Sequence, residues 1–265
     1  SRNRMKRVSP RMFALIFAVC FLVAIPFGIK AVHDQHTQTE TPVVAEPTPP
    51  AEPTPTPAGE PTPTPEAHPV KEFTQVDASY FDDALMIGDS RTVGLMEYGG
   101  MDNLCYFATQ GMSVYNVREA EVSVAQYGKV TLETLLTQHT FGKIYVMLGV
   151  NELGYDFSTT VSQYQALVAQ IRQWQPDAIF FVEANLHLAQ KRSDSDSVFN
   201  NTNINRLNAE IAKLADQRTV FYIDINELFD DENGYLRADY TSDSTHVYGK
   251  YYQEWSAWLC TKGIL

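Results

Sequence analysis

The sequence predicts a three-layer α/β/α sandwich built on a parallel five-stranded sheet. Two observations indicate this α/β fold class. Short apolar runs of the kind that form buried parallel strands recur between residues 84 and 223. Stretches with apolar residues at helical spacing lie between the later runs. Such alternation of strands and helices is typical of a parallel sheet covered by helices on both faces.

Five apolar runs are the expected strands: Ala84–Ile87, Leu104–Ala108, Ile144–Leu148, Ala178–Val182 and Val220–Ile223. Three stretches are expected helices: Val161–Trp174, Ile204–Leu214 and Gly249–Thr261. Ser158 and Thr159 are suitable amino-terminal caps for the first helix. The last helix presents four large apolar residues on one face, which we expect in the core: Tyr252, Trp255, Trp258 and Leu259.

Residues 1–33 are expected to be a basic cytoplasmic tail followed by a membrane anchor. A basic cluster between Arg2 and Arg11 precedes an uncharged apolar run over residues 12–29, and about 18 residues is the lower end of what spans a bilayer. The basic side should stay cytoplasmic, which places the rest of the chain outside the cell. A cleaved signal peptide, and hence secretion, is the alternative. We favour the anchor because the run is long and no clear cleavage site follows it.

Residues 34–70 are expected to be a linker. Proline alternates there with threonine and glutamate, a composition that buries little surface and favours extended polyproline geometry. At ~3.1 Å per residue, such a stalk could reach on the order of 100 Å. A structured ligand for a proline-binding partner is the alternative. Residues 71–265 then form one domain of ordinary size.

The charge and cysteine content of residues 71–265 exclude several kinds of function. The chain has a net charge of −12, and the basic residues up to Lys30 are balanced by the acidic residues of the linker, so the domain itself is acidic. This argues against binding to nucleic acid or anionic lipid. Cys105 and Cys260 are too few and too far apart for a disulfide framework or a metal site, and their redox state is open.

The stretch from Ala84 to Ser90 supplies the first candidate site residue. Four apolar residues run into Gly88, Asp89 and Ser90, which places the serine at the carboxyl end of a buried strand, where open α/β sheets bind ligands. A serine there can be a nucleophile if a histidine activates it. Taken alone, Gly-Asp-Ser is more often an ordinary turn.

Two further stretches follow predicted strands at the same edge. Gly111 ends the second strand with a backbone N–H that a ligand could approach closely. Asn151 follows Gly149 after the central strand, and its amide could donate to a developing oxyanion. Each residue alone is equally well explained by a turn or a cap.

The base candidate among the domain's three histidines is His246. Asp243 precedes it by three residues, so its carboxylate can fold back to hold Nδ1–H and leave Nε2 free to take a proton. His139 ends a helical pattern and is expected to be structural. His187 follows a strand and could line the rim of the site, but no acid stands at a useful spacing from it.

Together, Gly88-Asp89-Ser90, Gly111, Gly149-x-Asn151 and Asp243-x-x-His246 resemble the SGNH/GDSL hydrolase family, in the family's order, over about residues 84–258. The resemblance implies a flavodoxin-like fold that needs no metal or organic cofactor. It also implies that Ser90 is the nucleophile, His246 the general base and acid, and Asp243 its orienting partner. The oxyanion hole would comprise the N–H groups of Ser90 and Gly111 and the Asn151 amide.

The sequence departs from the family pattern at two places. Glu152 stands where many members have aspartate, and Ser244-Thr245 replaces a small apolar dipeptide. Neither change removes a catalytic atom, so both bear on substrate preference more than on activity.

The expected function is an extracellular serine esterase, acting as a monomeric catalytic domain, that removes acyl groups from cell-wall or surface glycans, with O-acetyl groups expected. Lipase, thioesterase and acyltransferase activities are alternatives within the family, and a non-catalytic glycan-binding module is an alternative from another class. Five residues near the catalytic edge are of the kinds that sugars stack on or bond to, although they could equally be ordinary loop residues: Tyr155, Phe157, His187, Lys191 and Arg192.

Overall fold

The structure is a computed structural model that describes residues 69–265. The expected anchor at residues 12–29 lies outside the described residues, as does the expected linker up to residue 68, and both stay predictions. No helix within residues 69–265 is long and apolar enough to span a membrane.

The domain is organised around a five-stranded sheet in the order β2-β1-β5-β6-β7, with every pair parallel. The strands are β1 (Ala84–Gly88), β2 (Cys105–Ala108), β5 (Lys143–Met147), β6 (Ile179–Glu183) and β7 (Val220–Ile223). This confirms the predicted sheet and its five strands to within about a residue or two at each end. Because all the strands run the same way, their carboxyl ends share one edge.

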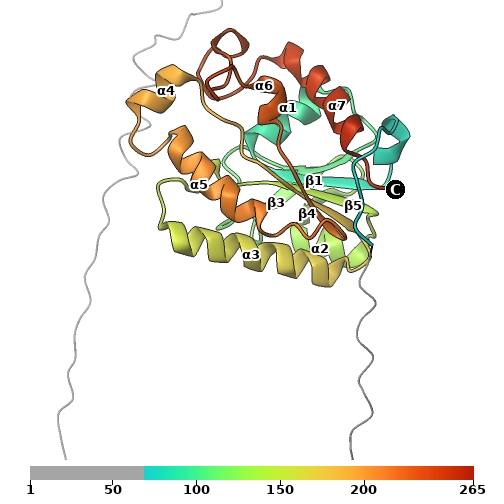
Figure 1. Cartoon of the computed structure of the whole chain (residues 1–265). Coiled ribbons are helices and arrows are strands. Elements are labelled where there is room, and N and C mark those ends of the chain that lie inside the picture. The colour runs from blue at the N-terminus through green and yellow to red at the C-terminus, as the bar shows by residue number, and fades with distance from the viewer. Residues whose placement is uncertain (1–68) are drawn as a thin grey trace, which may run out of the picture. The chain divides into compact units, whose positions relative to one another are not determined.

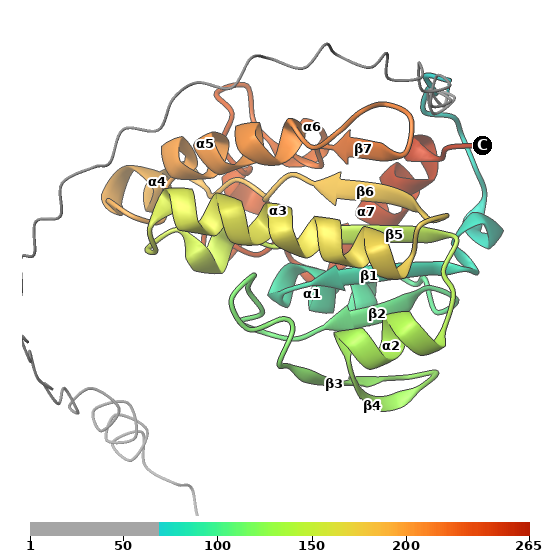
Figure 2. The same ribbon diagram turned by 90° about the horizontal axis from the view of Figure 1, so that it is seen from below.

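Helices cover both faces of the sheet, which confirms the three-layer prediction (Figures 1 and 2). One face is covered by α2 (Leu132–Gln138), α3 (Phe157–Trp174) and α5 (Asn201–Ala212), and the other by α1 (Ser90–Tyr98), α6 (Asn226–Phe229) and α7 (Tyr252–Leu259). The short helix α4 (Gln190–Ser195) follows β6. Among residues 69–265, five short 3₁₀ turns accompany these helices: η2 (Ala78–Phe81), η3 (Val150–Glu152), η4 (Ala238–Tyr240), η5 (Gly249–Tyr251) and η6 (Cys260–Lys262).

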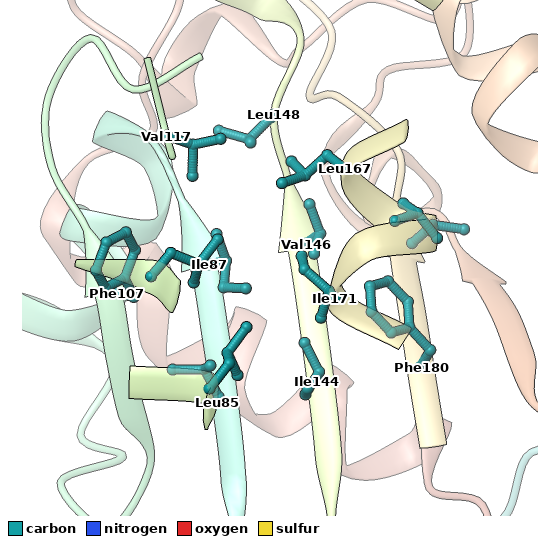
Figure 3. Packing of buried hydrophobic residues seen from close by; sticks show 14 of the residues in the cluster. Leu85, Ile87, Phe107, Val117, Ile144, Val146, Leu148, Leu167, Ile171 and Phe180 are labelled. Atoms are coloured by element: carbon teal, nitrogen blue, oxygen red, sulfur yellow. The ribbon is translucent and has the colours of Figure 1, made fainter. Parts of the chain in front are cut away.

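Alternate residues of each strand enter two separate cores, because successive side chains of a strand point to opposite faces. Leu85 and Ile87 of β1 pack with Ile144 and Val146 of β5 against α3, as Figure 3 shows. Met86 packs on the opposite face, with α1 and α7. Both faces of the strands are therefore apolar, which explains their uninterrupted apolar runs.

Three details differ from the sequence predictions. Helix α3 begins at Phe157 and is capped by Asp156, whose side chain accepts from the Thr159 N–H at 2.8 Å, so Ser158 and Thr159 lie inside the helix. The expected last helix is divided into η5, α7 and η6, although its four large apolar residues are buried as predicted. A hairpin of β3 (Glu121–Val124) and β4 (Gly128–Thr131) was not predicted, since its strands bury few side chains.

Candidate active site

Ser90 is positioned by the tight junction between β1 and α1. Gly88 ends β1, where any Cβ would collide with the Thr92 side chain, so only glycine lets the helix begin this close to the strand. The Asp89 carboxylate caps α1 by accepting from the Arg91 N–H at 3.1 Å. Ser90 is then the first residue of the helix, at the carboxyl edge of the sheet.

The structure brings Ser90, His246 and Asp243 into one hydrogen-bonded chain. Ser90 Oγ lies 2.8 Å from His246 Nε2, and His246 Nδ1 lies 2.7 Å from Asp243 Oδ2. Burial opposes charge on Asp243, but hydrogen bonds from the His246 backbone and ring and from the Thr245 backbone outweigh it and hold the pKa of Asp243 well below its usual value. An ionised Asp243 keeps Nδ1 protonated and leaves Nε2 to accept the Ser90 proton.

The dipeptide that departs from the family pattern secures the loop carrying Asp243 and His246. Ser244 has a left-handed backbone, with φ of 64°, and its carbonyl accepts from the Ala189 N–H at 3.0 Å. The Thr245 hydroxyl accepts a hydrogen bond from the guanidinium of Arg192 in α4. The segment after β6 therefore supports this loop from outside.

The two remaining oxyanion candidates lie on loops that follow β2 and β5. Gly111 has a φ of 74°, a left-handed conformation that favours glycine, and its carbonyl accepts from Asn116 Nδ2 at 3.1 Å. Asn151 lies in η3 and donates one amide hydrogen to the Met112 carbonyl at 2.9 Å. Its second amide hydrogen is left to donate elsewhere.

Ser90, Gly111 and His246 line one open hollow. Helix α1 forms one wall, and the remaining lining residues are Val93, Gly94, Glu97, Tyr98, Gln110, Val247 and Tyr252. Asn151 is not among them and meets this site through Met112, the neighbour of Gly111. The structure thus brings Ser90, His246 and Gly111 together around one hollow. Asn151 is connected to this hollow only indirectly, through its hydrogen bond to Met112.

The five expected rim residues have different surroundings. Tyr155 is 61% exposed and stacks on Tyr115 with ring centroids 4.7 Å apart. The Phe157 ring lies under the Arg206 guanidinium. Arg192 supports the catalytic loop as described, and Lys191 is an exposed residue of α4.

His187 has an acid partner that no short sequence spacing indicated. Asp230, 43 residues further along the chain, lies 2.7 Å from His187 Nδ1, and Asn205 Oδ1 lies 2.7 Å from Nε2. Burial disfavours the charged imidazole, but the bond to Asp230 and its charge outweigh this and raise the pKa of His187. Both ring nitrogens are occupied, so His187 is a structural residue in this arrangement.

A buried polar network next to Ser90 was not predicted from the sequence. Arg91 Nε and Nη2 donate to the two oxygens of Asp89, and Nη2 also donates to Asn185 Oδ1 at 2.9 Å. All three residues are almost fully buried. A charge-assisted bidentate pair of this kind fixes the start of α1 beneath the nucleophile candidate.

Within residues 69–265, no three His, Cys, Asp or Glu side chains are grouped so as to hold a metal ion. Cys105 and Cys260 are free thiols in this part of the chain.

A parallel α/β sandwich with a Ser-His-Asp hydrogen-bonded chain at its carboxyl edge defines the architecture of a serine-type hydrolase. Residues 86–253 match the GDSL-like Lipase/Acylhydrolase family. The chain therefore belongs to this family and is an ester-bond hydrolase.

Solved structures with the same fold have low sequence identity. A GDSL-like lipase from Bacteroides thetaiotaomicron is 16% identical with a TM-score of 0.52, over 70% of this chain and 89% of that one. A protein from Streptococcus pneumonia, described provisionally as a platelet activating factor, is 18% identical with a TM-score of 0.51, over 67% and 81%. No curated protein matches the sequence. At these identities the likeness establishes the fold.

Proposed function

We propose that this domain is a serine esterase that removes small acyl groups, O-acetyl above all, from cell-wall or surface glycans outside the cell. The observation that carries the proposal is the chain from Ser90 Oγ through His246 to Asp243, with distances of 2.8 and 2.7 Å. These are the distances that a nucleophile and its base require.

The reaction proceeds in two halves. Ser90 Oγ attacks the acyl carbon while its proton passes to His246 Nε2, and the oxyanion accepts hydrogen bonds from the Ser90 and Gly111 N–H groups and the Asn151 amide. The ester C–O bond then breaks, and His246 gives its proton to the departing alcohol. Water then attacks the acyl-serine while His246 Nε2 takes its proton. The bond between the acyl carbon and Ser90 Oγ breaks, and His246 returns the proton to Oγ, which releases the acid and restores Ser90.

A sugar-bearing substrate is supported by an aromatic and polar surface beside the oxyanion loops. The exposed Tyr155 ring is backed by Tyr115, whose hydroxyl is hydrogen-bonded to Thr160 at 2.9 Å. Tyr155 also lines a small pocket, together with Glu152, Leu153, Phe157, Thr160, Asn203, Arg206 and Leu207. A rigid aromatic face next to amide and guanidinium donors suits a hydroxyl-rich ring better than an acyl chain.

An extracellular, tethered location is supported by the basic cluster that precedes the uncharged apolar run over residues 12–29. Lys71 N–H bonds to the Gln217 carbonyl just before β7, and Thr74 pairs with Gly263. These contacts lie at the amino ends of the strands, opposite to Ser90. A tether that precedes residue 69 would therefore join the domain away from its catalytic edge.

The proposal is tested with a ladder of p-nitrophenyl esters and with acetylated xylan and peptidoglycan as substrates for residues 69–265. We expect acetyl esters to be cleaved and hexanoyl or longer esters to be at least about tenfold worse in kcat/KM, because a site suited to acetyl groups would have to accommodate the extra methylenes at a cost. Acetate release from either glycan is expected as well. A rise in kcat/KM from acetyl to octanoyl would instead indicate a lipase or thioesterase.

A further inference from the structure

Glu152 connects the two loops that carry the oxyanion candidates. Its side chain is 1% exposed, and Oε1 accepts from the Val114 N–H at 2.6 Å. Glu152 directly follows Asn151, and Val114 lies three residues after Gly111. This bond therefore joins the loop after β5 to the loop after β2.

A second bond runs alongside the first. Asn151 Nδ2 donates to the Met112 carbonyl at 2.9 Å, so neighbouring residues of one loop hold alternate residues of the other. In the sheet order, β1 lies between β2 and β5. The paired bonds consequently bridge the two loops on either side of Ser90, at the end of β1.

The second oxygen of the Glu152 carboxyl, Oε2, does not connect the two loops. Oε2 is buried and has no hydrogen-bond partner among the described residues. The ionisable groups that interact with it are Asp89 and Arg91 at the start of α1 and Tyr164 of α3. An unpaired buried oxygen costs stability, so Oε2 gives no reason for a glutamate at this position. The side-chain hydrogen bond that accounts for Glu152 is the one from the Val114 N–H to Oε1.

We propose that Glu152 is a positioning residue, which fixes the Gly111 N–H relative to the Asn151 amide so that both donors meet the same oxyanion. The inference rests on the proposed function, in which these donors stabilise the transition state. Misplacing a donor that acts only there lowers kcat and leaves KM nearly unchanged.

Two substitutions of similar size separate the effect of the hydrogen-bond acceptor at residue 152 from the effect of side-chain volume. Glu152→Gln keeps an oxygen for the Val114 N–H, whereas Glu152→Met fills the same space without one. With p-nitrophenyl acetate, we expect Glu152→Met to lower kcat by about tenfold or more with KM within about threefold. Glu152→Gln is expected to stay within about threefold of the unsubstituted protein in both constants.

Glu183→Met is the matched control. Glu183 is also a buried acid near Arg91 with an unpartnered Oε2, but among the described residues no side-chain hydrogen bond joins it to the oxyanion loops. We expect Glu183→Met to keep kcat within about threefold of the unsubstituted value, and its melting temperature is measured to show that it folds.

Three outcomes would overturn the inference: equal losses of kcat in Glu152→Met and Glu183→Met, a tenfold loss in Glu152→Gln, or an unchanged kcat in Glu152→Met. If Glu152→Met does not fold, Glu152→Leu, which also lacks the acceptor for the Val114 N–H, takes its place with the same loss of kcat expected. Ser90→Ala is measured in parallel. Full activity in that variant would refute the proposed function itself, whereas an inactive Ser90→Ala with a normal Glu152→Met would refute only the role of Glu152.

Discussion

Asp89 shows how one buried side chain prepares the nucleophile candidate next to it. One carboxylate oxygen caps α1 through the Arg91 N–H, and the same group pairs with the Arg91 guanidinium. Asp89 is fully buried, so both bonds form away from competing water. The turn from Gly88 to Arg91 is thereby fixed from below, and Ser90 Oγ faces His246.

The nucleophile assignment predicts selective covalent labelling. A fluorophosphonate probe should label Ser90, because a histidine-activated serine is nucleophilic near neutral pH. Ser90→Ala and His246→Ala should each abolish hydrolysis and leave the circular dichroism spectrum unchanged. Mass spectrometry of the labelled peptide identifies the site, and labelling of any other serine would refute the assignment.

Asn151 provides a second prediction at the same scale. Replacing it with alanine should lower kcat by ~10²–10³ with little change in KM, as for a donor used mainly in the transition state. Steady-state kinetics with p-nitrophenyl acetate measure both constants. Asn116→Ala is the comparison: it removes a side-chain bond to the Gly111 carbonyl but no proposed oxyanion donor, so it should lower kcat less than Asn151→Ala does. A raised KM with unchanged kcat in Asn151→Ala would make Asn151 a substrate-binding residue.

At the scale of elements, local patterns predicted the five strands and the order of the site residues, because both faces of each strand are buried and each candidate follows a strand end. The remaining features depend on contacts between distant segments. The pairing of His187 with Asp230 spans 43 residues, and the bond from Val114 to Glu152 spans 38. Nothing in the spacing of either pair indicates that they meet.

The crossing of α1 and α7 gives a prediction about stability. Gly94 of α1 lies against Tyr252 of α7, and a Cβ at residue 94 would overlap the tyrosine ring. Gly94→Ala should therefore destabilise the domain by about 1–3 kcal/mol through overpacking. Gly154→Ala is the control, since its Cβ would lie 3.6 Å from Val198, an ordinary contact. Urea unfolding of both variants measures the difference, and equal stabilities would show that the helices separate easily.

At the scale of the whole molecule, two of the acidic side chains, Glu152 and Glu183, are buried in the interior. Burial raises the pKa of Glu152 to about 7 and that of Glu183 to about 8. A carboxyl whose folded pKa lies above its unfolded value stays protonated in the folded state while the unfolded chain ionises. Its cost to stability is absent below the ordinary pKa near 4.5 and grows as the pH rises toward the folded pKa.

These shifts predict that the domain loses stability between pH 5 and pH 8. The raised pKa of His187 acts in the same direction, because its stabilising charge is present below about 6.5 and is lost as the pH rises through the folded pKa. The lowered pKa of Asp243 adds no slope in this range, because its contribution is complete above the ordinary value of 3.8.

Glu183→Gln should flatten this dependence, because the glutamine has no proton to lose. Each unit of pKa difference corresponds to about 1.4 kcal/mol, so the change in slope is measurable by urea unfolding at pH 5 and pH 8. Glu232→Gln is the control at an exposed acid and should keep the original slope. If Glu183→Gln and the unsubstituted domain lose equal stability over this range, then Glu183 is ionised in the folded state, paired with the neighbouring Arg91 charge.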